Sequence, residues 1–252
     1  MFSNSYDIDN YSTEHDNFFL AVPFVPTEEE VVDAMLKLAR VGSKDVIYDL
    51  GSGDGRILIS AAKDRDARGV GIDIDPTRVA DAMEFAGWAG VEYLVDFIED
   101  DIFTADVSPA TVVTLYLLQS INVQLRPRLL KELRPGTRIV SHAFDMGDWH
   151  ADESLKINGI NIYKWVVPAQ IAGTWEFEHE GKSYRLELEQ KYQEITGTAW
   201  EDSKIVELES TALEGKRLDI VLNRAGAPAE TGFTLTFAAG KLASVSVFDV
   251  ES

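Results

Sequence analysis

The sequence predicts an α/β protein with a doubly wound, mostly parallel sheet, followed by a small antiparallel β domain. Two observations support this fold class. Short apolar segments alternate with amphipathic helical patterns from residue 27 to residue 142, which is typical of a parallel sheet with helices on both faces. From Gly173 onward, polar and apolar residues alternate between turn residues with no helical period, which is typical of antiparallel strands.

The individual elements follow from local patterns. Thr27 is expected to be the N-cap of the first helix, with Glu30 completing a capping box before an apolar stripe over 31–39. Asn158-Gly159 lies between two apolar segments and is a strong hairpin signal. The other expected helices cover 56–63, 76–88 and 120–133, and the expected strands cover 45–50, 69–73, 91–98, 111–117, 137–142, 155–157 and 160–165.

These patterns divide the chain into three parts. Residues 1–20 are polar without a clear period, so we expect an N-terminal arm or lid. Residues 21–168 are expected to form the α/β domain, which would bind a cofactor. Residues 169–252 are expected to form the small all-β domain, whose apolar face covers its own core and which offers a docking surface for another protein.

Composition excludes several classes of function. The 252 residues carry 43 acidic and 23 basic side chains, a formal net charge of −20, so we expect no nucleic-acid partner. The chain has no cysteine and no zinc-binding His motif, and we expect no metal. No apolar segment is long enough to span a membrane, and residues 1–17 lack the features of a secretory signal, so we expect a cytoplasmic protein.

The most informative segment is a glycine-rich turn between a strand and a helix. Asp49, Gly51 and Gly53 belong to the string DLGSGDG, in which alternate glycines let a ligand approach the backbone at a helix N-terminus. Asp73 ends the next strand, where a carboxylate can accept both ribose hydroxyls. Asp101 follows the third strand, where it can accept the amine of an adenine, with Ile102 beside the ring.

Two nucleotide classes use this layout, and a nicotinamide cofactor fits less well because Arg56 stands where that fingerprint has its third glycine. The strings DLGSGDG, GVGIDID and EDDIF together resemble the class I S-adenosylmethionine-dependent methyltransferases, over roughly residues 20–167. The resemblance implies a seven-strand Rossmann-like sheet that ends in a hairpin. It also implies that Asp49 and the glycines hold the methionine end of the cofactor, Asp73 the ribose and Asp101 the adenine.

A second resemblance concerns the segment VPFVPT ahead of the first helix, taken together with GSGDGRI. The pair is similar to the small protein-lysine methyltransferases of mitochondria and their bacterial relatives. It implies that Phe24 and Thr27 close over the methionine end of the cofactor. From the residues alone, the segment is equally well explained as a hydrophobic entry to the helix.

The residues that would act on the substrate are less well defined. His142 and Asp145 follow the fifth strand and Tyr116 ends the fourth, at the sheet edge where ligands bind in open α/β folds. His142 is a candidate base, Tyr116 a candidate lining residue, and Asp145 with Asp148 and Trp149 a candidate cage for a cationic amine. Each of the three also has an ordinary structural explanation.

The sequence therefore predicts an S-adenosylmethionine-dependent methyltransferase that acts on an amine, with a protein lysine as the preferred acceptor. The net charge of −20 would attract basic chains. The alternatives are a small-molecule methyltransferase with the same cofactor half, and a non-catalytic module whose β extension carries out the recognition.

Overall fold

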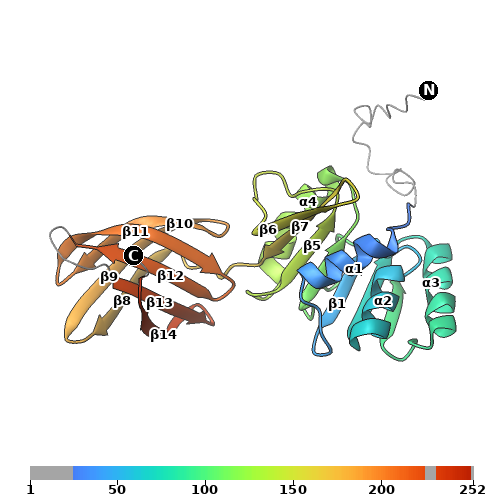
Figure 1. Cartoon of the computed structure of the whole chain (residues 1–252), viewed down its shortest axis with the longest axis horizontal. Helices are drawn as coiled ribbons and strands as arrows, with labels where there is room; N and C mark the ends of the chain where they lie inside the picture. The colour runs from blue at the N-terminus through green and yellow to red at the C-terminus, as the bar shows by residue number, and fades with distance from the viewer. Residues whose placement is uncertain (1–24, 225–230, 251–252) are drawn as a thin grey trace, which may run out of the picture.

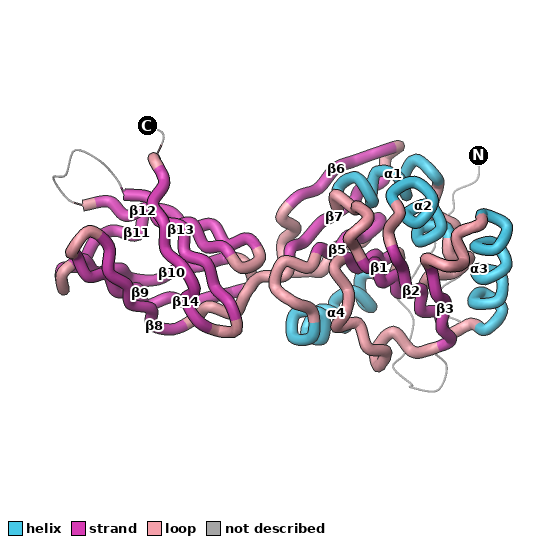
Figure 2. The backbone as a smooth tube through the Cα atoms, turned by 90° about the horizontal axis from the view of Figure 1, so that it is seen from below, coloured by secondary structure: helices cyan, strands magenta, loops and turns pink. Residues whose placement is uncertain are grey.

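The computed structural model describes residues 25–224 and 231–250. These residues form two lobes along the long axis of the molecule, each built around a seven-stranded sheet (Figure 1). Helices pack only against the first sheet, and the second lobe is made of strands and turns (Figure 2). The arm or lid expected over residues 1–20 lies outside the described residues.

The first sheet is mixed, with the strand order β3-β2-β1-β4-β5-β7-β6. Its five N-terminal strands pair in parallel, and the β6–β7 hairpin adds antiparallel to β5. The mixed α/β architecture is therefore confirmed. The strands are β1 Val46–Leu50, β2 Arg68–Asp73, β3 Val95–Glu99, β4 Val112–Leu115, β5 Arg138–His142, β6 Glu153–Ile157 and β7 Ile160–Val166; the helices are α1 Glu29–Leu38, α2 Arg56–Arg65, α3 Pro76–Ala89 and α4 Gln119–Glu132.

The helices cover both faces of this sheet, so its central strands are buried on each side (Figure 2). α1, α2 and α3 share one apolar core with the strands, in which Met35 and Leu58 are fully buried. α4 shares the other core, in which Leu125 and Leu129 are fully buried. Burial of apolar surface on both faces stabilises a parallel sheet and leaves its strand ends free to form a site.

Several expected boundaries were wrong. The fourth strand stops at Leu115, so Tyr116 follows it instead of ending it. α1 begins at Glu29 with Glu28 at the N-cap position, and no side chain caps it, because the Thr27 hydroxyl is engaged elsewhere. The third strand begins at Val95, not at residue 91, because α3 continues to Ala89 and ends at Gly90, which has a φ of +69°. The Val91 N–H then bonds the Ala86 carbonyl in the helix-terminating turn.

The second sheet is an antiparallel meander, as the alternating pattern predicted, with β8 and β14 at its edges. It is strongly curved: Trp175 on β8 packs edge-to-face on Phe237 of β13, with ring centroids 4.9 Å apart, although four strands separate β8 from β13 in the sheet. The strands are β8 Gly173–His179, β9 Lys182–Lys191, β10 Glu194–Glu201, β11 Lys204–Glu214, β12 Arg217–Asn223, β13 Thr231–Ala238 and β14 Lys241–Phe248.

Short turns with positive φ set the register of the hairpins. Asn158 and Gly159 have φ values of 51° and 84°, and Ile157 pairs with Ile160, which confirms the predicted hairpin.

Among the described residues, the helices are too short or too polar to cross a membrane.

Candidate functional site

The turn after β1 is narrow because glycines adopt conformations that other residues avoid. Gly51 has a φ of +79°, and a Cβ there would lie 2.8 Å from a Leu117 methyl. Gly55 has a φ of +77°, and a Cβ there would lie 2.5 Å from the Phe97 ring. The tight turn brings the N-terminus of α2, which begins at Arg56, to the carboxyl edge of the sheet. Free backbone N–H groups at such a terminus favour a ligand with negative or polar groups.

The three predicted carboxylates lie at the ends of three adjacent strands. Asp49 is 3% exposed on β1 and accepts a hydrogen bond from the Thr114 hydroxyl at 2.7 Å. Asp73 ends β2 and accepts from the Gly53 N–H at 2.8 Å, which ties the glycine turn to the neighbouring strand. Asp101 follows β3, is half-buried, and accepts from the Phe103 N–H at 2.8 Å.

The environment of Asp49 opposes its negative charge. The pKa of this carboxyl is raised from 3.8 to about 7, mainly by burial and also by the charges of Asp73 and Asp54, while the Thr114 hydrogen bond opposes the rise. A cation bound nearby would offset this cost. The site is therefore suited to a ligand that carries positive charge close to β1.

The donor set fits S-adenosylmethionine. Asp49 would provide a buried carboxylate for the positive end of that molecule, and the backbone of Gly51 is exposed beside it. The Ser52 hydroxyl oxygen is buried and has no hydrogen-bond partner among the described residues. A buried hydroxyl without a partner is costly, so this position favours a bound polar group.

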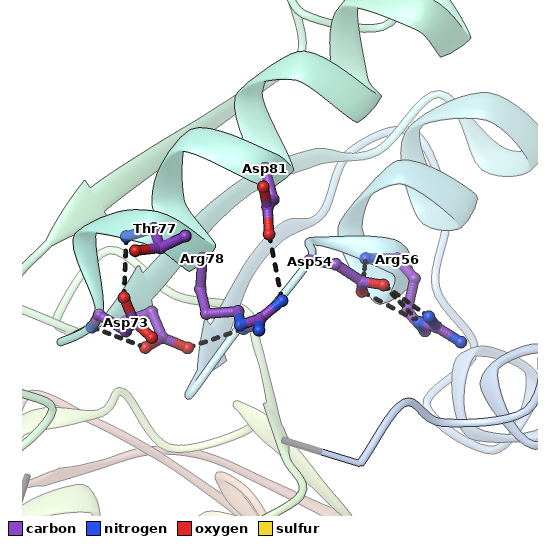
Figure 3. Close-up of polar contacts among 8 residues, drawn as sticks. Asp54, Arg56, Asp73, Thr77, Arg78 and Asp81 are labelled. Carbon is purple, nitrogen blue, oxygen red and sulfur yellow. Dashed lines mark hydrogen bonds and ion pairs between the residues drawn. The ribbon is translucent and has the colours of Figure 1, made fainter. Parts of the chain in front are cut away.

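Arg56 is a component that sequence reasoning did not assign. Its guanidinium forms an ion pair with Asp54 at 2.5 Å, as Figure 3 shows, and donates to the Thr27 carbonyl at 2.8 Å. It thereby fastens the segment before α1 to the glycine turn. The arginine that directly follows GSGDG in the sequence was the available signal.

Thr27, Tyr116 and His142 meet at the edge of the sheet, although they come from three distant parts of the chain. The Thr27 hydroxyl lies 3.1 Å from His142 Nδ1, and both residues are buried. The Tyr116 ring stacks on the imidazole, with centroids 3.7 Å apart and an interplanar angle of 21°. Phe24, the other residue expected to close over the cofactor, lies outside the described residues.

Burial keeps the His142 imidazole neutral. It lowers the pKa of this side chain from 6.5 to about 4, because the charged form loses hydration. Burial also raises the pKa of Tyr116 above 10.0. The edge next to the glycine turn is therefore lined by uncharged aromatic groups that can form hydrogen bonds.

The acidic residues after β5 do not form a cage around Trp149. Asp145 accepts hydrogen bonds from the Gln119 amide and from the Gly147 N–H. Trp149 is fully buried and donates its indole N–H to Gln193 in the second sheet, at 2.7 Å. Asp148 is paired with Arg126 at 2.6 Å and with Lys191 at 3.2 Å. The interpretation of Asp148 and Trp149 as an amine cage was wrong, because both are used in contacts between the two lobes.

The arrangement at this edge of the sheet is typical of one class of protein. A glycine turn at a helix N-terminus, with carboxylates at the ends of β1, β2 and β3, suits an adenosine-containing ligand at the carboxyl edge of an α/β sheet. The uncharged aromatic groups beside it lie at the ends of β4 and β5.

Known proteins share this part of the chain. A family model described as the ANTKMT methyltransferase domain matches residues 49–153. The chain is 43% identical over 151 residues to a protein-lysine N-methyltransferase of Saccharolobus islandicus, a match that covers 58% of this chain and 94% of the relative. It is 32% identical over 130 residues to the adenine nucleotide translocase lysine N-methyltransferase of Mus musculus, across 52% of this chain and 56% of the relative. An RNA methyltransferase from Salinibacter ruber, solved in complex with S-adenosyl-L-homocysteine, is 56% identical with a TM-score of 0.58, across 58% of this chain and 96% of that chain.

The chain belongs to the class I S-adenosylmethionine-dependent methyltransferases, in the family that includes the Saccharolobus enzyme. It is an enzyme, and S-adenosylmethionine is its cofactor, as the sequence predicted. These matches do not favour the nicotinamide or the non-catalytic alternative. The family model ends at residue 153, so it does not include the second sheet.

Proposed function

We propose that the enzyme methylates the side-chain amine of a lysine in a protein substrate. The observation that carries this proposal is the stack of the half-buried Tyr116 ring on the buried, neutral His142 imidazole beside the cofactor turn. An amine must lose its proton before it can accept a methyl group, and an uncharged surface favours the neutral amine. The names of the Saccharolobus and mouse relatives, both lysine methyltransferases, support the same acceptor.

The cofactor roles follow from the positions of the carboxylates. We infer that the sheet is Rossmann-like and binds the cofactor at the carboxyl ends of its strands. Asp49, Gly51 and Gly53 would lie at the methionine end of S-adenosylmethionine. Asp73 would accept the ribose hydroxyls, and Asp101 with Ile102 would hold the adenine. Thr27 and Phe24 would close over the methionine end, and the Arg56 contact with the Thr27 carbonyl supports this placement for Thr27.

The reaction requires positioning more than acid or base strength. Bound S-adenosylmethionine supplies a methyl group on a positively charged sulfur. The amine nitrogen forms a bond to the methyl carbon as the carbon–sulfur bond breaks, and the nitrogen then releases a proton. His142 is neutral at physiological pH, and because its lowered pKa makes it a weak base, it would orient the amine while the proton leaves to water. Tyr116 would line the channel. The Asp145 carboxylate accepts a hydrogen bond from the Gln119 amide, and its negative charge would attract the basic substrate.

Charge supports a protein acceptor over a nucleic acid. The net charge of −20 attracts lysine-rich segments and repels phosphates. The absence of a nucleic-acid partner stays a prediction, because the Salinibacter relative is described as an RNA methyltransferase. We further propose that the second sheet contributes to docking of the protein substrate. The cytoplasmic location expected from the sequence also stays a prediction.

Methyl labelling would test the proposal. Purified enzyme would be incubated with tritium-labelled S-adenosylmethionine and a cell extract, which is then separated into protein, nucleic-acid and small-molecule fractions. The Asp73→Ala variant provides the matched control, since it should lose cofactor binding. Label in the protein fraction is expected with the wild-type enzyme only. Label confined to the RNA or to the small molecules would refute the lysine acceptor.

A further inference from the structure

The turn between β9 and β10 of the second sheet contacts the loop that follows β5 of the first sheet. The loop spans residues 143–152 and begins directly after His142, so it borders the proposed acceptor site. The turn consists of Tyr192 and Gln193, between the paired residues Lys191 and Glu194. These contacts join a part of the chain outside the matched family model to the edge where the substrate would bind.

Gln193 holds the loop through both ends of its amide. Its Oε1 accepts the Trp149 indole N–H at 2.7 Å, and its Nε2 donates to the His150 carbonyl at 2.8 Å. Trp149 is fully buried, so a lost partner would leave an indole N–H without a hydrogen bond. The His150 ring adds a contact at 3.2 Å to Glu194, the first residue of β10.

Tyr192 contacts the same loop through its aromatic ring and its hydroxyl, and Lys191 contacts the loop through its charge. The Tyr192 ring stacks on Trp149, with centroids 5.8 Å apart, and its hydroxyl lies 3.2 Å from an Asp148 carboxylate oxygen. The Arg126 guanidinium lies 5.3 Å from the centre of the same ring and also pairs with Asp148. Lys191 contacts the second Asp148 oxygen at 3.2 Å.

The backbone of the turn adopts an unfavourable conformation at Tyr192. Tyr192 has a φ of +57°, a conformation that is unfavourable for a bulky side chain and that Asn or Gly adopts readily in hairpin turns. Such strain persists where the surroundings fix it and is concentrated at functional positions. Here the surroundings are Trp149, Asp148 and Arg126.

A short series of hydrogen bonds connects this loop to the end of β5, where the site lies. Arg126 donates to the Met146 carbonyl at 2.6 Å, and Asn122 donates to the Phe144 carbonyl at 3.2 Å. The Phe144 N–H in turn bonds the His142 carbonyl at 2.8 Å. Asn122 also bonds the Ser141 hydroxyl at 3.1 Å, so the end of β5 and the loop share one network.

We propose that Tyr192 and Gln193 are positioning residues for methyl transfer, and that the second sheet is thereby a functional part of the acceptor site. They act through Trp149 and the 143–152 loop on the alignment of the protein substrate beside His142. This inference rests on the proposed function only for its rate measurement. The rigidity of the loop can be measured without any substrate.

Full-length Gln193→Ala and Tyr192→Ala variants test the proposal, with Tyr192→Phe keeping the ring but not the hydroxyl. Lys216→Ala is the matched control, because Lys216 lines a separate cavity between the lobes with Arg40, Arg138 and Glu214. Hydrogen exchange of the 143–152 amides would be followed by mass spectrometry. The apparent KM and kcat would be measured with the protein fraction of a cell extract, and the affinity for S-adenosylhomocysteine by calorimetry.

Both alanine variants should accelerate exchange in the loop and lower kcat/KM by about tenfold or more, through misplacement of the substrate. Tyr192→Phe should fall between the wild type and Tyr192→Ala, because it keeps the ring on Trp149 and loses the hydroxyl contact with Asp148. Lys216→Ala and all cofactor affinities should stay within about twofold of the wild type, since sites without shared partners are independent. Unchanged exchange in the loop would overturn the proposal. An equal loss in Lys216→Ala, or a parallel loss of cofactor affinity, would also overturn it, because either would show a general effect on the fold. If the wild-type enzyme transfers no label, the proposed function fails, and the exchange result still decides the positioning role.

Discussion

Replacing Asp49 with Asn should stabilise the cofactor-free protein while weakening its binding of S-adenosylmethionine. The wild-type carboxyl is 3% exposed, and its pKa is raised from 3.8 to about 7, first by burial and then by the charges of Asp73 and Asp54. Asn keeps an oxygen that can accept the Thr114 hydrogen bond and carries no charge. The substitution therefore removes the electrostatic cost and preserves the contact.

The size of the effect depends on pH in a defined direction. A raised pKa means that the folded protein disfavours the charged form, so the cost is absent below pH 3.8 and complete above about pH 7. At about 1.4 kcal/mol per pH unit, the gain in unfolding free energy should be about 2 kcal/mol at about pH 5.5 and about 4 kcal/mol at about pH 8. Cofactor binding should fall at both pH values, because the carboxylate that would face the positive end of S-adenosylmethionine is gone.

Urea denaturation at these two pH values would measure the free energy of unfolding for the wild type and the variant. Asp96→Asn is the control, because Asp96 is exposed on β3 and the substitution removes the same charge. A variant that is no more stable than the wild type at the higher pH would refute the reasoning. An equal gain at both pH values would refute it too, since titration of Asp49 could not then be the cause.

Three further predictions concern the cofactor and the acceptor side. Asp73→Ala should weaken S-adenosylhomocysteine binding by ~1.5–3 kcal/mol, measured by calorimetry, because a partly buried carboxylate and its bond to the Gly53 N–H are lost; unchanged affinity would contradict the ribose role. The pKa of His142 is lowered to about 4, so the methyl-transfer rate should show no step near pH 6.5, and NMR titration of the imidazole should show it neutral above about pH 5; an imidazole that titrates near pH 6.5 would contradict its burial. Gly55→Ala should lower the melting temperature and abolish cofactor binding, because the φ of +77° and the Phe97 ring at 2.5 Å exclude a methyl group; a variant that binds normally would show that the turn tolerates a side chain.

The cofactor half could be predicted from the sequence because its signals are local. DLGSGDG specifies a strand, a turn and a helix within a few residues, and each acid follows an apolar strand, so the sheet topology brings the acids to one edge. The Asn158-Gly159 hairpin is equally local. These patterns depend on neighbours in the sequence, and the structure reproduces them.

The errors arose where long-range contacts override local preference. Thr is a residue type that often caps helices, but the Thr27 hydroxyl contacts His142 instead. His142 is distant in the sequence, and both side chains are buried. Trp149 among acidic residues suggests an exposed aromatic cage, but Gln193 and Tyr192 of the second sheet bury it. A single sequence contains no signal for the packing of one sheet on the loop of another, so neither contact could be predicted.

The identity of the methylated residue decides whether the enzyme acts on lysine. Protein labelled with a tritiated methyl group by the full-length enzyme would be hydrolysed in acid, and the amino acids separated by chromatography. We expect the label to elute as methylated lysine, and Asp73→Ala to yield none. Label in methylated arginine, glutamine or histidine, or label that requires RNA in the reaction, would contradict it.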